Sequence, residues 1–81
     1  MDPNQIKHLI EAGIEESEAR VDGDGRHFQA LVISAAFEGR SVIAQHRLVY
    51  AALGSHFDGD ALHALSLRTY TPEQWRLLGT A

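Results

Sequence analysis

The side chains best suited to bind a metal in this sequence are its five histidines, His8, His27, His46, His56 and His63. The chain contains no cysteine, so it forms no disulfide and supplies no thiolate. Imidazole nitrogens and carboxylate oxygens are therefore the metal ligands that it offers. No motif places a nucleophile beside a base, and no glycine-rich phosphate loop is present, so the sequence does not favour an enzyme.

His63 stands at the predicted start of a strand, directly after a loop rich in Gly, Ser and Asp at residues 54–60. Such a position exposes a side chain to a ligand while the strand holds it in place. The alternative is a half-buried histidine that is hydrogen-bonded to this loop. A metal requires the neutral imidazole, whose ordinary pKa is about 6.5, so acid would weaken binding.

The other histidines have structural interpretations. His46 falls on the apolar face of a predicted helix, which indicates a core or interfacial residue. His8 is expected on the surface of the first helix, and His56 in the loop that follows the second.

The helix predicted over residues 42–53 organises the chain. Ser41 is a suitable N-cap, and Gly54 stands where a helix commonly ends. A period of 3.6 residues places its apolar face on Val42, His46, Val49 and Leu53, widened by Ala44, Leu48 and Ala51.

A first helix is predicted from a capping box in which Asp2 is the N-cap, Pro3 takes the first position and Gln5 closes the box. Gly13 is expected to end it in a left-handed conformation. The buried stripe is predicted to be Ile6, Leu9 and Ile10, with Ile14 after the helix, and the side chains directed to solvent to be Lys7, His8 and Glu11.

Three strands are predicted, over residues 15–21, 27–36 and 61–70. Alternation indicates that the first strand has one solvent-exposed face. Apolar residues of both parities indicate that the second strand is either covered on both faces or central in a small sheet. The Asp-Gly turn at residues 22–25 predicts antiparallel pairing of these two, and the helical crossover allows the third strand to lie parallel to one of them. A short helical turn is expected before the second long helix.

A last helix is predicted to begin with Thr71 as cap, Pro72 at the first position and Gln74 closing the box, so that Trp75 and Leu78 cover the sheet. The order of elements is then α-β-β-α-β-α, a sandwich of the α+β class.

Four motifs in this order, Phe37–Gly39, His46–Tyr50, His63–Leu65 and Thr71–Trp75, resemble the BolA family across nearly the whole chain. The short loop before His27 and Phe28 is similar to that of the IbaG (YrbA)-like branch. The resemblance implies one BolA-like domain over residues 1–81, arranged like a type II KH domain with a helix-turn-helix-like segment.

The resemblance further implies a non-enzymatic partner of a monothiol glutaredoxin, with a [2Fe–2S] cluster shared between the two proteins. His63 would be a ligand, while the partner's cysteine and its bound glutathione supply sulfur. His27 is the candidate second ligand, or otherwise a residue at a strand end. Arg40 and Arg47 would contact the partner's acidic surface or the glutathione carboxylates, or are ordinary solvated arginines.

The alternative function is a nucleic-acid-binding regulator. The formal net charge of −4, the scattered lysines and arginines and the lack of a Gly-x-x-Gly loop after the second strand disfavour it. No apolar stretch approaches the roughly 20 residues that span a bilayer, and the N-terminus does not resemble a signal peptide, so a cytoplasmic protein is expected.

Overall fold

The structure, a computed structural model, describes residues 2–54 and 64–79. Along the chain lie α1 (Pro3–Gly13), β1 (Ser17–Gly23), β2 (Phe28–Ser34), the 3-10 turn η1 (Ala35–Phe37), α2 (Val42–Leu53), β3 (Leu65–Tyr70) and α4 (Pro72–Gly79). This order confirms the predicted α-β-β-α-β-α sequence, including the short turn before the second long helix.

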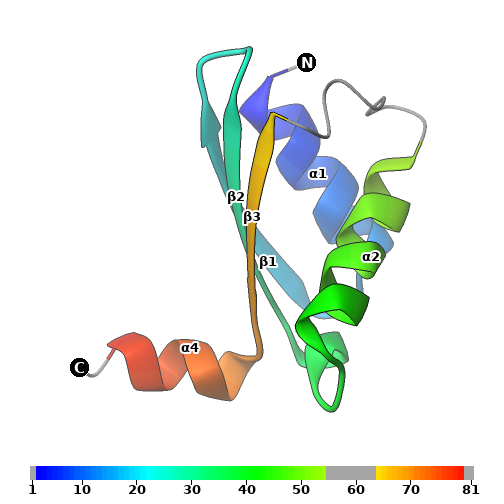
Figure 1. The fold of residues 1–81 in the computed structure, drawn as a ribbon, viewed down its shortest axis with the longest axis vertical. Helices are drawn as coiled ribbons and strands as arrows, with labels where there is room; N and C mark the ends of the chain where they lie inside the picture. The colour runs from blue at the N-terminus through cyan, green and yellow to red at the C-terminus, as the bar shows by residue number, and fades with distance from the viewer. Residues whose placement is uncertain (1, 55–63, 80–81) are drawn as a thin grey trace.

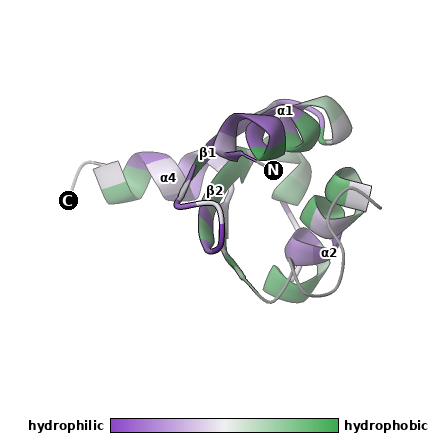
Figure 2. Ribbon diagram, turned by 90° about the horizontal axis from the view of Figure 1, so that it is seen from above, coloured by the Kyte–Doolittle hydropathy of each residue, from purple (hydrophilic) through white to green (hydrophobic). Residues whose placement is uncertain are grey.

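The sheet has three strands in the order β1-β2-β3. β1 pairs antiparallel with β2, and β3 pairs parallel with β2, so the central position of β2 is confirmed. α1 and α2 lie together on one side of the sheet, and α4 projects away from the end of β3 (Figure 1). Figure 2, which looks down on the molecule, shows α4 on the side of the sheet away from α2.

The core lies between the sheet and the two long helices. Strand residues of one parity face the helices, because side chains alternate between the faces of a strand. The core residues that are wholly buried are Ile6, Ile10, Ala19, Val32, Phe37, Val49 and Leu53.

The predicted helix starts are confirmed. The Asp2 carboxylate accepts a hydrogen bond from the Gln5 backbone N–H, and the Gln5 side chain accepts one from the Asp2 N–H. Thr71 and Gln74 make the same reciprocal pair at α4. Each pair satisfies backbone donors that a helix N-terminus leaves without partners.

The predicted buried face of α2 is partly wrong. Val42 is 62% exposed, whereas Gln45 is buried together with Val49 and Leu53. His46 is half-buried. Hydrophobic periodicity excluded Gln45 because it is polar, but this amide has partners in η1 and β3 that make its burial favourable.

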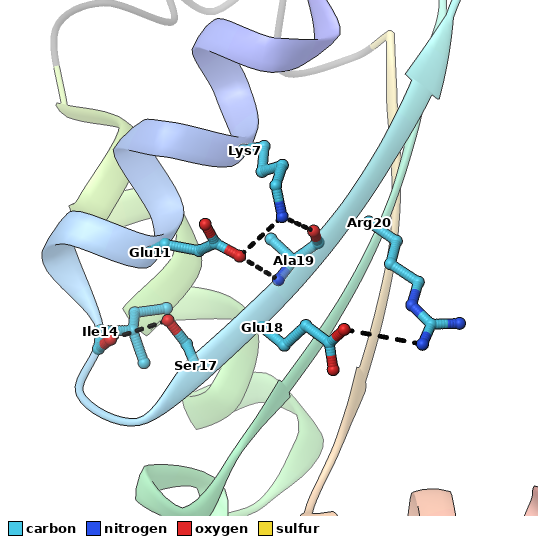
Figure 3. Close-up of polar contacts among 7 residues, drawn as sticks. All are labelled: Lys7, Glu11, Ile14, Ser17, Glu18, Ala19 and Arg20. Carbon is cyan, nitrogen blue, oxygen red and sulfur yellow. Dashed lines mark hydrogen bonds and ion pairs between the residues drawn. The ribbon is translucent and has the colours of Figure 1, made fainter.

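Two predictions for α1 are also corrected. Gly13 has no positive φ. It is small because α2 approaches closely, so that a Cβ at this position would lie 2.6 Å from the Cβ of Ala52. Lys7 and Glu11 are directed to β1 instead of solvent: the Lys7 ammonium donates to the Ala19 carbonyl, and Glu11 accepts from the Ala19 N–H (Figure 3).

The remaining differences concern strand ends and α4. β3 begins at Leu65, and the predicted strand residues 61–63 lie outside the described part of the chain. Trp75 is half-buried as predicted, but Leu78 is 52% exposed and does not cover the sheet. Of the helices described, none has the length and hydropathy to cross a membrane.

Candidate functional site

The turn between β1 and β2 holds the backbone of His27 at one end of the sheet. The Asp24 carboxylate accepts hydrogen bonds from the backbone N–H groups of Arg26 and His27, each of 2.8 Å. The Asp24 N–H donates to the His27 carbonyl at 3.2 Å. The backbone of His27 is therefore bonded on both sides, while its side chain is exposed and makes no hydrogen bond within the described residues.

Gly23 allows this turn to close. A Cβ at Gly23 would lie 2.5 Å from the His27 carbonyl oxygen and 2.6 Å from Cδ1 of Phe28. Real Cβ atoms do not approach other atoms this closely, so only glycine fits without displacing the start of β2. The sequence pattern identified the turn, but this requirement appears only where the two strands meet.

The charge of Asp24 reinforces the turn. The backbone N–H groups of His27 and Arg26 stabilise the carboxylate and hold the pKa of Asp24 below its ordinary value of 3.8. The turn is thus built for the ionised carboxylate, and protonation weakens the acceptor that positions His27.

His63 itself lies outside the described residues, but its neighbour Ala64 is described. The Phe28 N–H donates a 2.8 Å hydrogen bond to the Ala64 carbonyl, and Phe28 pairs in register with Leu65. The residues that follow the two candidate ligands, Phe28 after His27 and Ala64 after His63, are thus joined directly. The structure thus brings Phe28 and Ala64 together at one end of the sheet.

The two arginines predicted to contact a partner are exposed, but Arg40 is remote from His27. His27 precedes β2, whereas Arg40 follows η1 beyond the other end of that strand. A strand of seven residues spans roughly 20 Å. A partner that contacts both Arg40 and His27 would therefore have to contact the protein at two separate places. Arg47 lies on α2.

Neither of the other histidines in the described part of the chain lies in this turn. His8 is exposed on α1, and His46 is half-buried on α2. His56 lies outside the described residues, so its predicted place in a loop stays a prediction.

The described residues do not form a metal site by themselves. Within residues 2–54 and 64–79 no group of three or more His, Cys, Asp or Glu could hold a metal ion. Since the whole chain lacks cysteine, His27 and His63 would together supply fewer than the four protein ligands that a [2Fe–2S] cluster takes. Their chemistry fits the cluster only if a second protein completes the ligand set.

Sequence reasoning missed the face of the sheet away from α1 and α2. A shallow groove of about 420 Å³ lies there, lined by residues of all three strands that include Arg20, Leu31 and Arg68. The alternation along each strand predicts which residues share a face, but only the pairing register shows that these residues of different strands are neighbours.

A second groove, of about 680 Å³, lies between the start of α2 and α4 and includes Val42, Leu77 and Leu78. These three side chains are largely exposed. No sequence pattern predicts this groove, because it depends on how α4 leaves the sheet.

The fold and the short turn define a small α+β protein of the BolA class, and the comparisons agree. The model of the family described as BolA-like protein matches residues 7–74. The chain belongs to the BolA family. Similarity to the acid stress protein IbaG of Escherichia coli K12, 32% identical over 93% of this chain and 89% of that protein, supports the IbaG-like branch.

Other relatives support the same conclusion. A BolA protein homologue from Coxiella burnetii has a solved structure with a TM-score of 0.82 and 48% identity, covering 94% of this chain and 97% of that one. BolA1 from Arabidopsis thaliana gives a TM-score of 0.72 at 29% identity, covering 89% of this chain and 93% of that one. Human BolA-like protein 1 is 46% identical over 67% of this chain and 39% of its own length.

Proposed function

We propose that this protein is a non-enzymatic partner of a monothiol glutaredoxin and shares a [2Fe–2S] cluster with it. The observation that carries the proposal is the hydrogen bond from the Phe28 N–H to the Ala64 carbonyl. It joins Phe28, which follows His27, to Ala64, which follows His63 in the sequence, and in the BolA family a ligand role of the second histidine is expected.

The composition of the chain decides which cluster ligands each of the two proteins would supply. This chain supplies imidazoles, and a partner that provides a cysteine and glutathione supplies the sulfur ligands that this chain lacks. Replacing thiolates by imidazoles raises the reduction potential of such a cluster. Asp24 and Gly23 position His27, and its exposed side chain is accessible to a second protein.

The similarity to a protein named for acid stress is consistent with this chemistry. Imidazole binds a metal only when neutral, and its ordinary pKa is about 6.5. The shared cluster would therefore be lost in acid before a cluster held by thiolates alone.

The proposal is tested by anaerobic reconstitution of a monothiol glutaredoxin with glutathione, iron and sulfide, with and without this protein. Visible absorption and circular dichroism then report the cluster. We expect the wild-type protein alone to hold no cluster, and the mixture to give a spectrum different from that of the glutaredoxin alone.

Variants separate ligands from structural residues. His63→Ala should alter the shared spectrum while leaving the thermal midpoint nearly unchanged, and His27→Ala should do the same more weakly if it is the second ligand. His46→Ala should lower the midpoint and spare the spectrum, since His46 is half-buried on α2. His8→Ala, at an exposed position of α1, is the matched control. An unchanged spectrum with a lowered midpoint for His63→Ala would make His63 a structural histidine.

The alternative of a nucleic-acid-binding regulator gains no specific support from the fold. The described arginines are dispersed over the molecule. Arg20 and Arg68 lie on the open face of the sheet, and the others are Arg26 in the turn before β2, Arg40 just before α2, Arg47 on α2 and Arg76 on α4. Salt-dependent binding of duplex DNA by the isolated protein, with no effect on a glutaredoxin cluster, would favour that alternative.

A further inference from the structure

The face of the sheet away from α1 and α2 carries a row of three residues, one from each strand. Arg20 of β1 pairs with Leu31 of β2, and Leu31 pairs with Arg68 of β3. Adjacent strands lie roughly 4.8 Å apart, so the two arginines start about 10 Å from each other with Leu31 between them. In Figure 3 the side chain of Arg20 points away from α1.

The two guanidinium groups are available to a ligand. The side chain of Arg68 is exposed, and its guanidinium makes no hydrogen bond or ion pair within the described residues. Arg20 has a 3.6 Å contact to Glu18, in which both side chains are 58% exposed. Exposed ion pairs of this kind contribute little stability, so an anion can replace Glu18 at small cost.

The row lies in the groove of about 420 Å³ described above. This volume is within the range of sites that bind small molecules. Leu31 is half-buried at the centre. The next row consists of Asp22, Gln29 and Ser66, and the Asp22 carboxylate accepts a hydrogen bond from the Gly23 N–H. The protein has a formal net charge of −4, but the row of Arg20, Leu31 and Arg68 carries two positive charges and no carboxylate.

α4 covers the part of the sheet next to the groove. The ring of Trp75 lies 5.1 Å from the guanidinium carbon of Arg20, and α4 contacts β2 and β3. Ile33, two residues beyond Leu31 on the same face of β2, is accordingly only 6% exposed. The arginine row is therefore at the border between a covered and an open part of the sheet.

We propose that this groove binds a small organic anion. Its carboxylate or phosphate group lies between the guanidinium groups of Arg20 and Arg68, since planar guanidinium groups bind both kinds of anion through paired hydrogen bonds. Its apolar part lies on Leu31. This site is at a different place from His27 and is independent of cluster binding.

The test is a titration of the ¹⁵N-labelled full chain at constant ionic strength, followed by amide chemical shifts. The probes are hexanoate, hexyl phosphate, acetate and hexanol. We expect saturable shifts at the amides of Leu31 and Arg68 with at least one of the two six-carbon anions, and the stronger of the two identifies the head group. Hexanoate should bind more tightly than acetate by about two- to fourfold for each CH2 that is buried.

Variants locate the site. Arg68→Gln should weaken binding about tenfold or more, because hydrogen bonds to a charged group are lost. Arg40→Gln is the matched control: it lies in the second groove, and its loss should leave binding unchanged. Leu31→Thr keeps a residue suited to a strand and should reduce the preference for the longer chain.

Three results would overturn the proposal. The first is that neither six-carbon anion gives saturable shifts on the sheet. The second is that hexanol, which has no charge, binds as well as the anions. The third is that Arg68→Gln retains wild-type affinity while its spectrum remains that of the folded protein.

Discussion

The hydroxyl of Thr69 on β3 donates a 2.6 Å hydrogen bond to the side-chain oxygen of Gln45 on α2. The amide nitrogen of Gln45 donates in turn to the carbonyls of Phe37 and Arg40, at 3.2 and 3.0 Å. One buried amide therefore connects β3, η1 and the segment before α2. In a small core this network fixes where α2 begins relative to the sheet, because a buried polar group is stable only when its partners are in place.

Gln45→Ala is expected to lower the free energy of unfolding by about 2–3 kcal/mol, since it leaves carbonyl oxygens without their donor in a buried place. Thr69→Val, which keeps the shape and removes one donor, should cost less. Urea denaturation measures both, with Gln29→Ala at an exposed position as control. If the double variant lost the sum of the two single losses, the two side chains would not be coupled.

Glu11 should make the stability depend on pH. The hydrogen bond from the Lys7 ammonium, followed by that from the Ala19 N–H, lowers the pKa of Glu11 from its ordinary value of 4.5. A carboxyl whose pKa is lower in the folded state contributes stability above the unfolded pKa and loses it as the pH falls through the folded pKa. The contribution is therefore complete at neutral pH and disappears on acidification below about pH 4.5.

Glu11→Gln should accordingly reduce the free energy of unfolding by about 1 kcal/mol at neutral pH, through a weaker acceptor for Lys7 and Ala19. The difference from the wild type should shrink in acid. Urea denaturation across the acidic range measures it, with Glu15→Gln as the exposed control. A difference that stayed constant down to the lowest pH would show that the charge of Glu11 has no part in it.

Gly23→Ala should destabilise the turn that carries His27. The added Cβ would meet the His27 carbonyl and the side chain and backbone of Phe28, so β2 must shift at its start. We expect a loss of about 1–3 kcal/mol, as for other overpacked sites, together with a weaker effect of the protein on the glutaredoxin cluster. Gly79→Ala is the matched control, because nothing lies within 4 Å of a Cβ there. Equal thermal midpoints for the two variants would contradict the close approach.

The contact between Arg20 and Trp75 should be visible in fluorescence, because the chain contains one tryptophan. Arg20→Gln removes the cation from the ring and should shift the emission of Trp75. The loss of stability should be about 0.5–1 kcal/mol, as for exposed cation–π contacts. Arg26→Gln, in the turn before β2, is the control. Identical emission spectra for wild type and Arg20→Gln would mean that α4 does not hold Trp75 over Arg20.

The sequence by itself determined the features that depend on neighbouring residues. The reciprocal pairs of Asp2 with Gln5 and of Thr71 with Gln74 join residues three apart, so their types and spacing are sufficient to predict where α1 and α4 begin. The alternation in β1 and the two-sided apolar pattern of β2 likewise predicted which strand is central.

Tertiary structure decided whatever depends on elements that are distant in sequence. Gln45 is polar and was not expected in the core, but its partners come from η1 and β3. Gly13 is small because α2 passes close to it. Lys7 and Glu11 of α1 form hydrogen bonds with the backbone of Ala19 on β1, the next element of the chain.

The candidate site likewise has features that the sequence determines and features that only the tertiary structure decides. The turn that holds His27 is local, because Asp24 bonds to residues two and three positions away, and its chemistry could be predicted. That Arg20 and Arg68 flank Leu31 could not be predicted, because it follows from the register of three strands. Register depends on long-range pairing across the sheet, and a shift of one residue would turn each of these side chains to the other face.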